Sequence, residues 1–290
     1  MPVAAREVLV GGHKVIGAKH VRDGRPCQDD IAVVQVGSVA AVVVADGHGS
    51  SIHAEVGARL AVEVASAALL AFAASLGPEH RADPRAVHGF AQDPFRVQLV
   101  REWVRRVRDH AGSDTVDLKD YGSTLLFALV TPEFLLVGQL GDGDLIIVDG
   151  TGTVSRPLPA DPACFGEETS SLCQPEAWTS LNVLAIPRPD GETLLLASTD
   201  GYSKSYATDA DFERIGPDYL DMVRELGLAG VIRHLDAFLT AVTAGGSGDD
   251  VALGLLYLPP AARLPNASPA AEESPGHADG IALPITGDST

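Results

Sequence analysis

The residues most able to do chemistry in this chain are aspartates that adjoin runs of apolar residues. Asp46 ends the run from Ser38 to Ala45 and opens the tetrapeptide Asp46-Gly-His-Gly49. A carboxylate at the tip of a buried strand is costly unless a cation compensates it. Further aspartates stand in comparable places: Asp29, Asp142, Asp200 and Asp249. Each Asp-Gly pair could be a simple turn, but jointly they predict a shared metal site.

The chemistry that such a cluster could perform is hydrolysis at phosphorus. Carboxylate oxygens suit Mg²⁺ or Mn²⁺ better than zinc or copper. Two such ions can hold a water molecule, lower its pKa and direct it at a phosphoryl group. A histidine side chain ordinarily titrates near neutrality, so His48 could protonate the leaving group; the alternative is that His48 is an ordinary loop histidine. No P-loop and no GxGxxG motif after the first strand is present.

Strands and paired helices must position these residues. Apolar runs predict strands over residues 7–18, 31–36, 38–45, 123–130, 134–140, 145–148, 181–186, 193–198 and 251–258. Helices are predicted over 51–75, from a cap at Asp93 through Val107, and over 211–226 and 228–242, with a loop at 77–92. This order indicates antiparallel sheets covered by helices rather than alternating βαβ units.

Composition narrows the partners and the compartment. The 290-residue chain has 46% hydrophobic residues and a net charge of −18. That charge argues against nucleic acid and suits divalent cations or a substrate with basic flanks, although it could also serve solubility alone. The three cysteines lack CxxC spacing, which favours free thiols in a reducing compartment. No signal peptide and no apolar run near the roughly 18 residues of a membrane span is evident, so we expect a cytoplasmic protein without a membrane partner.

The chain divides into two parts by composition. Residues 1–258 are predicted to form one catalytic domain, in which the irregular stretch 157–180 is an insertion or flap. Residues 259–290 are rich in Ala, Pro, Ser and acidic residues, and we expect this tail to be disordered.

Six short motifs in one order resemble those of a known family. They are Cys27-Gln-Asp29, Asp46-Gly-His-Gly49, Gly122-Ser-Thr124, Gly141-Asp142, Ser198-Thr-Asp-Gly201 and Gly248-Asp-Asp250. Over residues 10–258 the chain resembles the metal-dependent (type 2C, PPM) serine/threonine protein phosphatases, as a divergent bacterial-type member. The resemblance implies an α+β fold: a four-layer α-β-β-α sandwich of two antiparallel sheets flanked by helices.

The resemblance also implies roles for the acidic residues. Two Mg²⁺ or Mn²⁺ ions would be held by Asp46, which bridges them, the Gly47 carbonyl, Asp200 and Asp249, with Asp29 near their water ligands. Asp142 together with Asp200 would match a weaker third metal site. His48 resembles the residue that protonates the leaving group.

The implied function is removal of phosphate from serine or threonine on proteins, in opposition to a Ser/Thr kinase. One departure concerns the substrate phosphate: family members carry an arginine where this chain has Gly24, and Arg22 or Arg25 could replace it. Two alternatives are an inactive relative that binds phosphoproteins and a phosphoesterase for small molecules. Manganese-dependent turnover, lost in Asp46→Asn, would distinguish the enzyme from the binding module.

Overall fold

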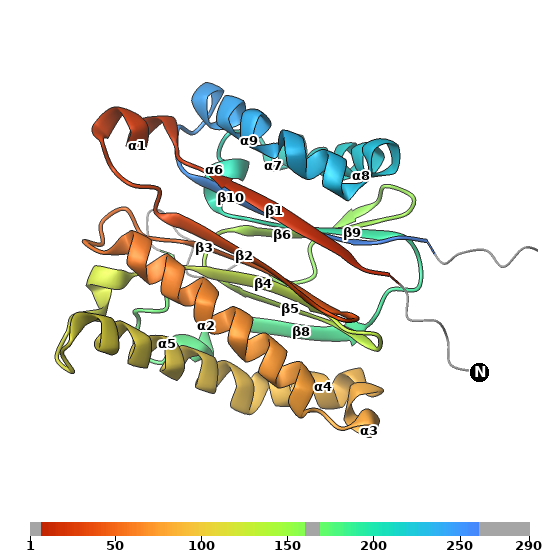
Figure 1. Ribbon diagram of the computed structural model, residues 1–290, viewed down its shortest axis with the longest axis horizontal. Helices are drawn as coiled ribbons and strands as arrows, with labels where there is room; N and C mark the ends of the chain where they lie inside the picture. The colour runs from red at the N-terminus through yellow and green to blue at the C-terminus, as the bar shows by residue number, and fades with distance from the viewer. Residues whose placement is uncertain (1–6, 160–168, 261–290) are drawn as a thin grey trace, which may run out of the picture.

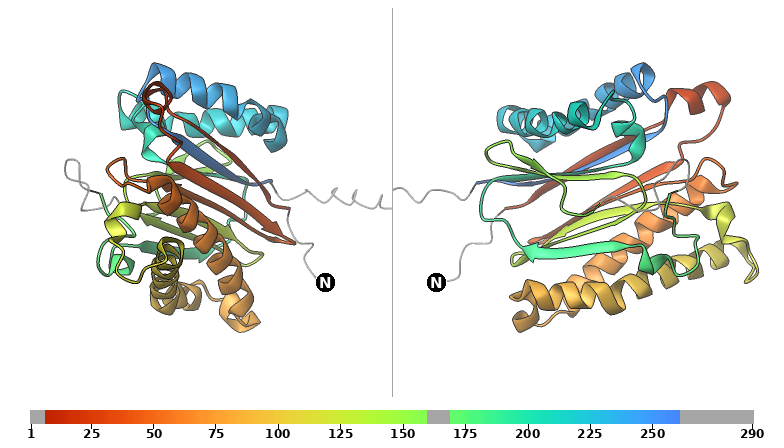
Figure 2. Two further views of the ribbon diagram at one scale, coloured as in Figure 1. Left: turned by 60° about the vertical axis from the view of Figure 1, so that its left-hand side comes forward. Right: turned by 180° about the vertical axis from the view of Figure 1, so that it is seen from behind.

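The computed structural model describes residues 7–159 and 169–260. Two five-stranded sheets, in which every strand pairing is antiparallel, pack face to face between two layers of helices (Figure 1). Figure 2 shows the same four layers from two further directions. The predicted α-β-β-α sandwich is confirmed.

The first sheet has the strand order β1-β10-β9-β6-β7. Its strands are β1 (Leu9–Val15), β10 (Val251–Leu258), β9 (Thr193–Ser198), β6 (Asp144–Asp149) and β7 (Val154–Ser155). Helices α8 (Ile215–Leu226) and α9 (Leu228–Gly245) cover its outer face (Figure 1). Leu253 and Leu255 of β10 face these helices and are fully buried.

The second sheet has the strand order β2-β3-β4-β5-β8. Its strands are β2 (Asp29–Val36), β3 (Val39–Asp46), β4 (Leu125–Val130), β5 (Phe134–Leu140) and β8 (Asn182–Pro187). Helices α2 (Ala54–Ser75) and α5 (Arg96–Ala111) cover its outer face (Figure 1). Trp103 of α5 is fully buried and donates its indole N–H to the Gly57 carbonyl of α2 at 3.1 Å.

The central strands are apolar throughout because both of their faces are covered. In β3, Ala41 and Val43 belong to the core beneath α2, whereas Val42 and Val44 belong to the core between the two sheets. Such strands lack the alternation of a half-exposed strand. The residue at the end of each of these strands therefore lies where the buried core ends.

The first predicted strand, 7–18, is too long. It ends at Val15, and α1 (Ala18–Asp23) follows. The Gly17 N–H donates to Asp250 Oδ1 at 2.6 Å, and the Lys19 N–H donates to the Gly248 carbonyl at 2.8 Å. These bonds to a segment more than 200 residues away turn the chain out of the sheet, which no local pattern could indicate.

The predicted loop at 77–92 also contains regular structure. It holds α3 (Pro78–Arg81) and α4 (Pro84–Phe90), and Asp83 caps α4 by accepting from the Arg85 N–H at 2.9 Å. Asp93 has φ −160° and ψ 123° in the kinked segment Ala91–Phe95 that precedes α5, which is the extended conformation of a residue at a helix start, with Pro94 directly after it. The predicted helix 211–226 is divided into α7 (Asp209–Glu213) and α8.

Three short helical segments complete the fold: η2 (Leu118–Tyr121), η3 (Ala177–Thr179) and α6 (Asp200–Ser203). In the predicted flap 157–180, residues 160–168 lie outside the described residues, and so does the predicted tail from residue 261 onward. The remainder of the flap packs beside β4, where the Leu172 N–H donates to the Ser123 carbonyl at 2.9 Å. The domain division stays a prediction.

Helix α2 is long and apolar enough, by length and composition, to cross a membrane. The most apolar 18-residue window of this 22-residue helix has a mean hydropathy of 1.7, in contrast to the expectation that no apolar run approaches the length of a membrane span. However, 56% of its most apolar 18-residue window is buried against the second sheet and α5. The apolar composition of α2 is therefore that of a core helix in a packed domain.

Candidate functional site

The strand ends with aspartates meet at one end of the sandwich. In the antiparallel pairing of β2 with β3, Asp29 lies directly opposite Asp46. Asp200 begins α6 just after β9, and Asp142 follows β5. A cavity of about 350 Å³ lies here, and its acidic lining residues include Asp46, Asp142, Asp200, Asp249 and Asp250. The structure thus brings together all the aspartates singled out in the sequence.

The innermost carboxylates are those of Asp29 and Asp46, whose side chains contact each other. Asp29 is only 3% exposed and accepts a hydrogen bond from Thr199 Oγ1 at 2.6 Å. Burial, and then the charge of Asp29, raise the pKa of Asp46 well above its usual range. Burial likewise raises the pKa of Asp29, against the hydrogen bond from Thr199. No ion pair reaches either carboxylate from residues 7–159 or 169–260, so the pair needs a proton or a cation.

Asp200 and Asp142 lie beside a lysine that the sequence did not single out. Lys204 Nζ forms an ion pair with Asp200 Oδ2 and lies 3.7 Å from Asp142 Oδ2. Thr169 Oγ1 donates to Asp142 Oδ1 at 3.1 Å. Burial and the neighbouring charge of Asp142 raise the pKa of Asp200 to about 6, although Lys204 opposes this shift.

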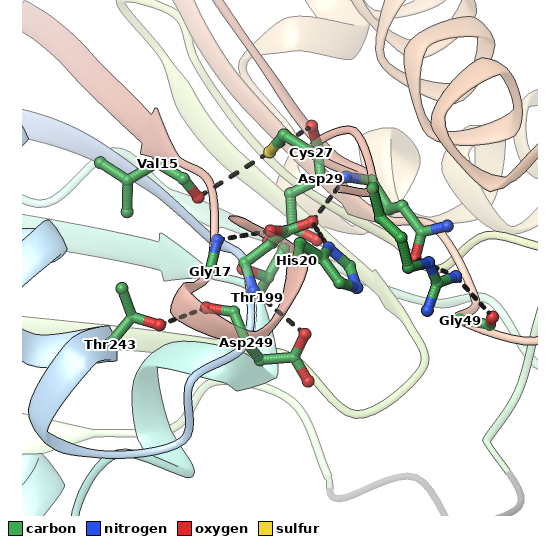
Figure 3. Close-up of polar contacts among 12 residues, drawn as sticks. Val15, Gly17, His20, Cys27, Asp29, Gly49, Thr199, Thr243 and Asp249 are labelled. Atoms are coloured by element: carbon green, nitrogen blue, oxygen red, sulfur yellow. Dashed lines mark hydrogen bonds and ion pairs between the residues drawn. The ribbon is translucent and has the colours of Figure 1, made fainter. Parts of the chain in front are cut away.

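The adjacent residues Asp249 and Asp250 are oriented for different tasks. Asp250 is 3% exposed and accepts from the Gly17 N–H and the Gln28 N–H, each at 2.6 Å. Its Oδ2 is also 2.8 Å from His20 Nδ1. Asp250 therefore joins three segments and has little capacity left for a ligand. The backbone carbonyl of Asp249 accepts a hydrogen bond from the Thr243 hydroxyl, and the Asp249 carboxylate points away from Thr243 (Figure 3).

Gly47 and His48 are held by backbone bonds between two loops. The Gly47 N–H donates to the Gln28 carbonyl at 3.1 Å, and the His48 N–H donates to the Gly122 carbonyl at 3.0 Å. A Cβ at Gly47 would lie 2.4 Å from the Ala54 carbonyl oxygen, so only glycine fits there. Both residues line the cavity. Burial lowers the pKa of His48, and the charge of Asp142 opposes this, so the imidazole is mainly neutral at pH 7.

The two candidate phosphate-binding arginines differ in position. Arg22 does not line the cavity; its side chain is 71% exposed and pairs with Asp23 at 2.8 Å. Arg25 lines the cavity, and its Nη2 donates to the Gly49 carbonyl at 2.8 Å and to Gln28 Oε1 at 3.3 Å. Gly24 ends α1 with φ 65°, a conformation that disfavours an arginine at that position and turns Arg25 toward the cavity.

The donor set fits hard divalent cations. It consists of carboxylates together with a backbone carbonyl, and a buried like-charge pair lies at its centre. Within the described ranges, no three His, Cys, Asp or Glu side chains are drawn together closely enough to hold a metal ion by themselves. Mg²⁺ and Mn²⁺ sites with few protein ligands keep several water molecules, so an open arrangement is compatible with them.

Sequence reasoning missed three functional neighbours: His20, Lys204 and Asp250. Their roles depend on contacts between distant segments or on which way one side chain points. Only Lys204 gave a local signal, because it lies four residues after Asp200 at the start of a helical turn.

Comparison with known proteins agrees with this geometry. The family model described as Protein phosphatase 2C matches residues 16–240. A sequence search of curated proteins gives no match. The solved structure of the S. agalactiae serine/threonine phosphatase is similar, with 15% sequence identity and a TM-score of 0.60. The match covers 87% of this chain and 100% of the S. agalactiae chain.

Two further solved structures are similar. The Mycobacterium tuberculosis serine/threonine phosphatase PstP/Ppp is 15% identical, with a TM-score of 0.55 over 87% of this chain and 99% of its own. The PstP catalytic domain in complex with 2 manganese ions is 16% identical, with a TM-score of 0.54 over 86% and 97%. At such identities these likenesses concern the fold, whereas the family model spans most of the chain. The chain belongs to the protein phosphatase 2C family.

Proposed function

We propose that this protein is a Mg²⁺- or Mn²⁺-dependent phosphatase that hydrolyses phosphoserine and phosphothreonine on proteins and opposes a Ser/Thr kinase. The observation that carries the proposal is that Asp29 lies opposite Asp46 and their carboxylates interact, while neither carboxylate forms an ion pair within the described residues. Membership of the family and the manganese ions in the PstP complex support it.

Four groups would hold two metal ions: the carboxylates of Asp46, Asp200 and Asp249, and the Gly47 carbonyl, with Asp29 contributing through water. When bound, such ions make water nucleophilic at neutral pH and offset charge on the phosphoryl oxygens. Asp250 and Thr199 act as positioning residues, because their hydrogen bonds fix the loops that carry Gln28 and Asp29.

His48 is placed to protonate the departing serine or threonine oxygen. Its imidazole lines the cavity, and burial keeps it mainly neutral. It must therefore take up a proton from cavity water before it can donate one. Such a group should matter most for poor leaving groups, which cannot depart as unprotonated alkoxides.

Arg25 is the better candidate for holding the substrate phosphate. Its guanidinium is positioned by two neutral oxygen acceptors, and no ion pair with a carboxylate occupies it within the described ranges. An arginine fork can bind two phosphate oxygens at once.

With a net charge of −18, the protein favours substrates whose phosphorylated segment has basic flanks. Free thiols at Cys27 and Cys173 are consistent with a cytoplasmic location.

A turnover assay tests the proposal. Metal-stripped protein is mixed with a phosphothreonine peptide, and released phosphate is measured with added Mn²⁺, with added Mg²⁺ and with a chelator. We expect turnover only with metal. Peptide binding without turnover in Mn²⁺ would instead favour a phosphoprotein-binding module. Hydrolysis of small phosphoesters but of no phosphoprotein would favour a small-molecule phosphoesterase.

A further inference from the structure

The resemblance to the phosphatase family implies a third metal site at Asp142 and Asp200, but in this chain an ammonium group faces both residues. Lys204 Nζ pairs with Asp200 Oδ2 and is 3.7 Å from Asp142 Oδ2. A protonated lysine has three donors and no lone pair, so it can balance carboxylates but cannot be a metal ligand. The residues present do not fit a third divalent ion.

The position of Lys204 follows from the local backbone. Asp200 begins α6, and the Lys204 N–H donates to the Asp200 carbonyl at 2.9 Å, which completes one helical turn. Residues four apart on a helix lie on the same face. The lysine side chain is 57% exposed while that of Asp200 is 10% exposed, so the ammonium approaches the carboxylates from the solvent side of the cavity.

We propose that Lys204 serves as a built-in cation in place of the third metal, so that this phosphatase binds two divalent ions rather than three. A divalent ion bound between Asp142 and Asp200 would lie next to the ammonium and be repelled by it. The ion pair occupies Oδ2 of Asp200 and leaves Oδ1 for one of the other two ions. The inference rests on the proposed function, because it presupposes the two ions at Asp46.

The pKa of Lys204 is consistent with this role. Burial would lower that pKa, but the charges of Asp200 and Asp142 outweigh burial and raise it.

Counting bound metal tests the inference independently of activity. Metal-stripped wild type, Lys204→Met, Lys204→Arg and Lys19→Met are titrated with Mn²⁺ while free Mn²⁺ is followed by its paramagnetic resonance signal. Lys19 is a matched control because it lines the same cavity. We expect two ions in wild type, Lys204→Arg and Lys19→Met. In Lys204→Met we expect a third ion, bound at least about tenfold more tightly than any third ion in wild type.

Three bound ions in wild type, or no change in Lys204→Met, would overturn the inference and leave the proposed function intact. A wild type that binds no manganese would overturn the proposed function, and the inference with it. The two failures are therefore distinguishable in one titration.

Discussion

The two halves of the acidic cavity differ in how their carboxylates are balanced. In the lysine-balanced half, Asp142 and Asp200 face the ammonium group of Lys204. In the unbalanced half, Asp29 and Asp46 face each other, and within the described ranges no cationic side chain pairs with either. Both halves lie at the same end of the same sheets, so the fold does not explain the difference.

The comparison indicates where this protein depends on metal. Like charges in a buried site repel unless protons or cations compensate them. The lysine-balanced half supplies its own cation, and the unbalanced half does not. We therefore assign the divalent ions to the unbalanced half, with the Gly47 carbonyl, Asp249 and the Asp200 oxygen that Lys204 leaves free as further ligands.

The largest effect should come from removing the central carboxylate of the unbalanced half. Asp46→Asn should lower kcat/KM with Mn²⁺ by about 10³-fold or more, because the proposed bridging ligand is lost. Asp30→Asn is the matched control: Asp30 is the next residue after Asp29 but pairs with Lys14 at 2.7 Å, outside the cavity. Phosphate release under identical conditions provides the measurement. Equal losses in both variants would contradict the assignment.

The metal-free protein should lose stability as pH rises. The pKa of folded Asp200 is raised to about 6, above its ordinary value in the unfolded chain. The folded state then holds the extra proton, so its contribution is present below the ordinary aspartate pKa and is lost as pH rises through about 6. This loss should reach up to about 3 kcal/mol.

Urea unfolding in a chelator at a series of pH values measures this loss. Lys204→Met should move the loss to higher pH, since the lysine holds the pKa of Asp200 down. A free energy of unfolding that is flat between roughly pH 4 and pH 7 in both proteins would refute the expected linkage.

A neutral side chain in the unbalanced half should stabilise the metal-free fold. At pH 8, Asp29→Asn should raise the free energy of unfolding by about 1–2 kcal/mol, because it removes one of two buried like charges and keeps the shape. In excess Mn²⁺ the order should reverse, since the variant binds metal less tightly. Thermal unfolding with and without Mn²⁺ measures both effects, and a destabilised metal-free variant would count against the unbalanced pair.

The smallest effect should come from replacing Arg25, which lines the cavity but belongs to neither half. Arg25→Ala should raise KM for a phosphopeptide about five- to tenfold, with metal binding unchanged, because only a contact to the substrate phosphate is lost. Arg22→Ala should leave KM within about twofold, since Arg22 is exposed and pairs with Asp23. The reverse order of the two variants would show that Arg22 holds the phosphate.

Much of the fold was predictable from the sequence, because strands that are buried on both faces have a recognisable apolar sequence pattern. Strands such as β3 and β10 are continuous apolar runs, and the carboxylates of Asp46 and Asp250 mark where these strands end or begin. The helix Ala18–Asp23 was not predicted, because so short a helix has no periodicity. Its conformation depends on bonds to Gly248 and Asp250.

The sequence predicted which residues form the site, but not how their charges are balanced. Motif order indicated which aspartates gather, but not that both carboxylate oxygens of Asp250 accept backbone N–H groups, whereas Asp249 accepts one, at Oδ1 from the Asp250 N–H at 3.0 Å. Choosing Arg25 over Arg22 needed the turn at Gly24. Ion pairs such as that of Lys204 depend on side-chain direction, which a one-dimensional pattern records only weakly.

The most direct test of the central claim is a crystal structure grown in excess Mn²⁺ and measured with anomalous scattering. The account predicts two anomalous peaks beside the Asp46 carboxylate and none between Asp142 and Asp200, where Lys204 remains. A cavity without a peak at Asp46, with Asp29 and Asp46 still in direct contact, would contradict it.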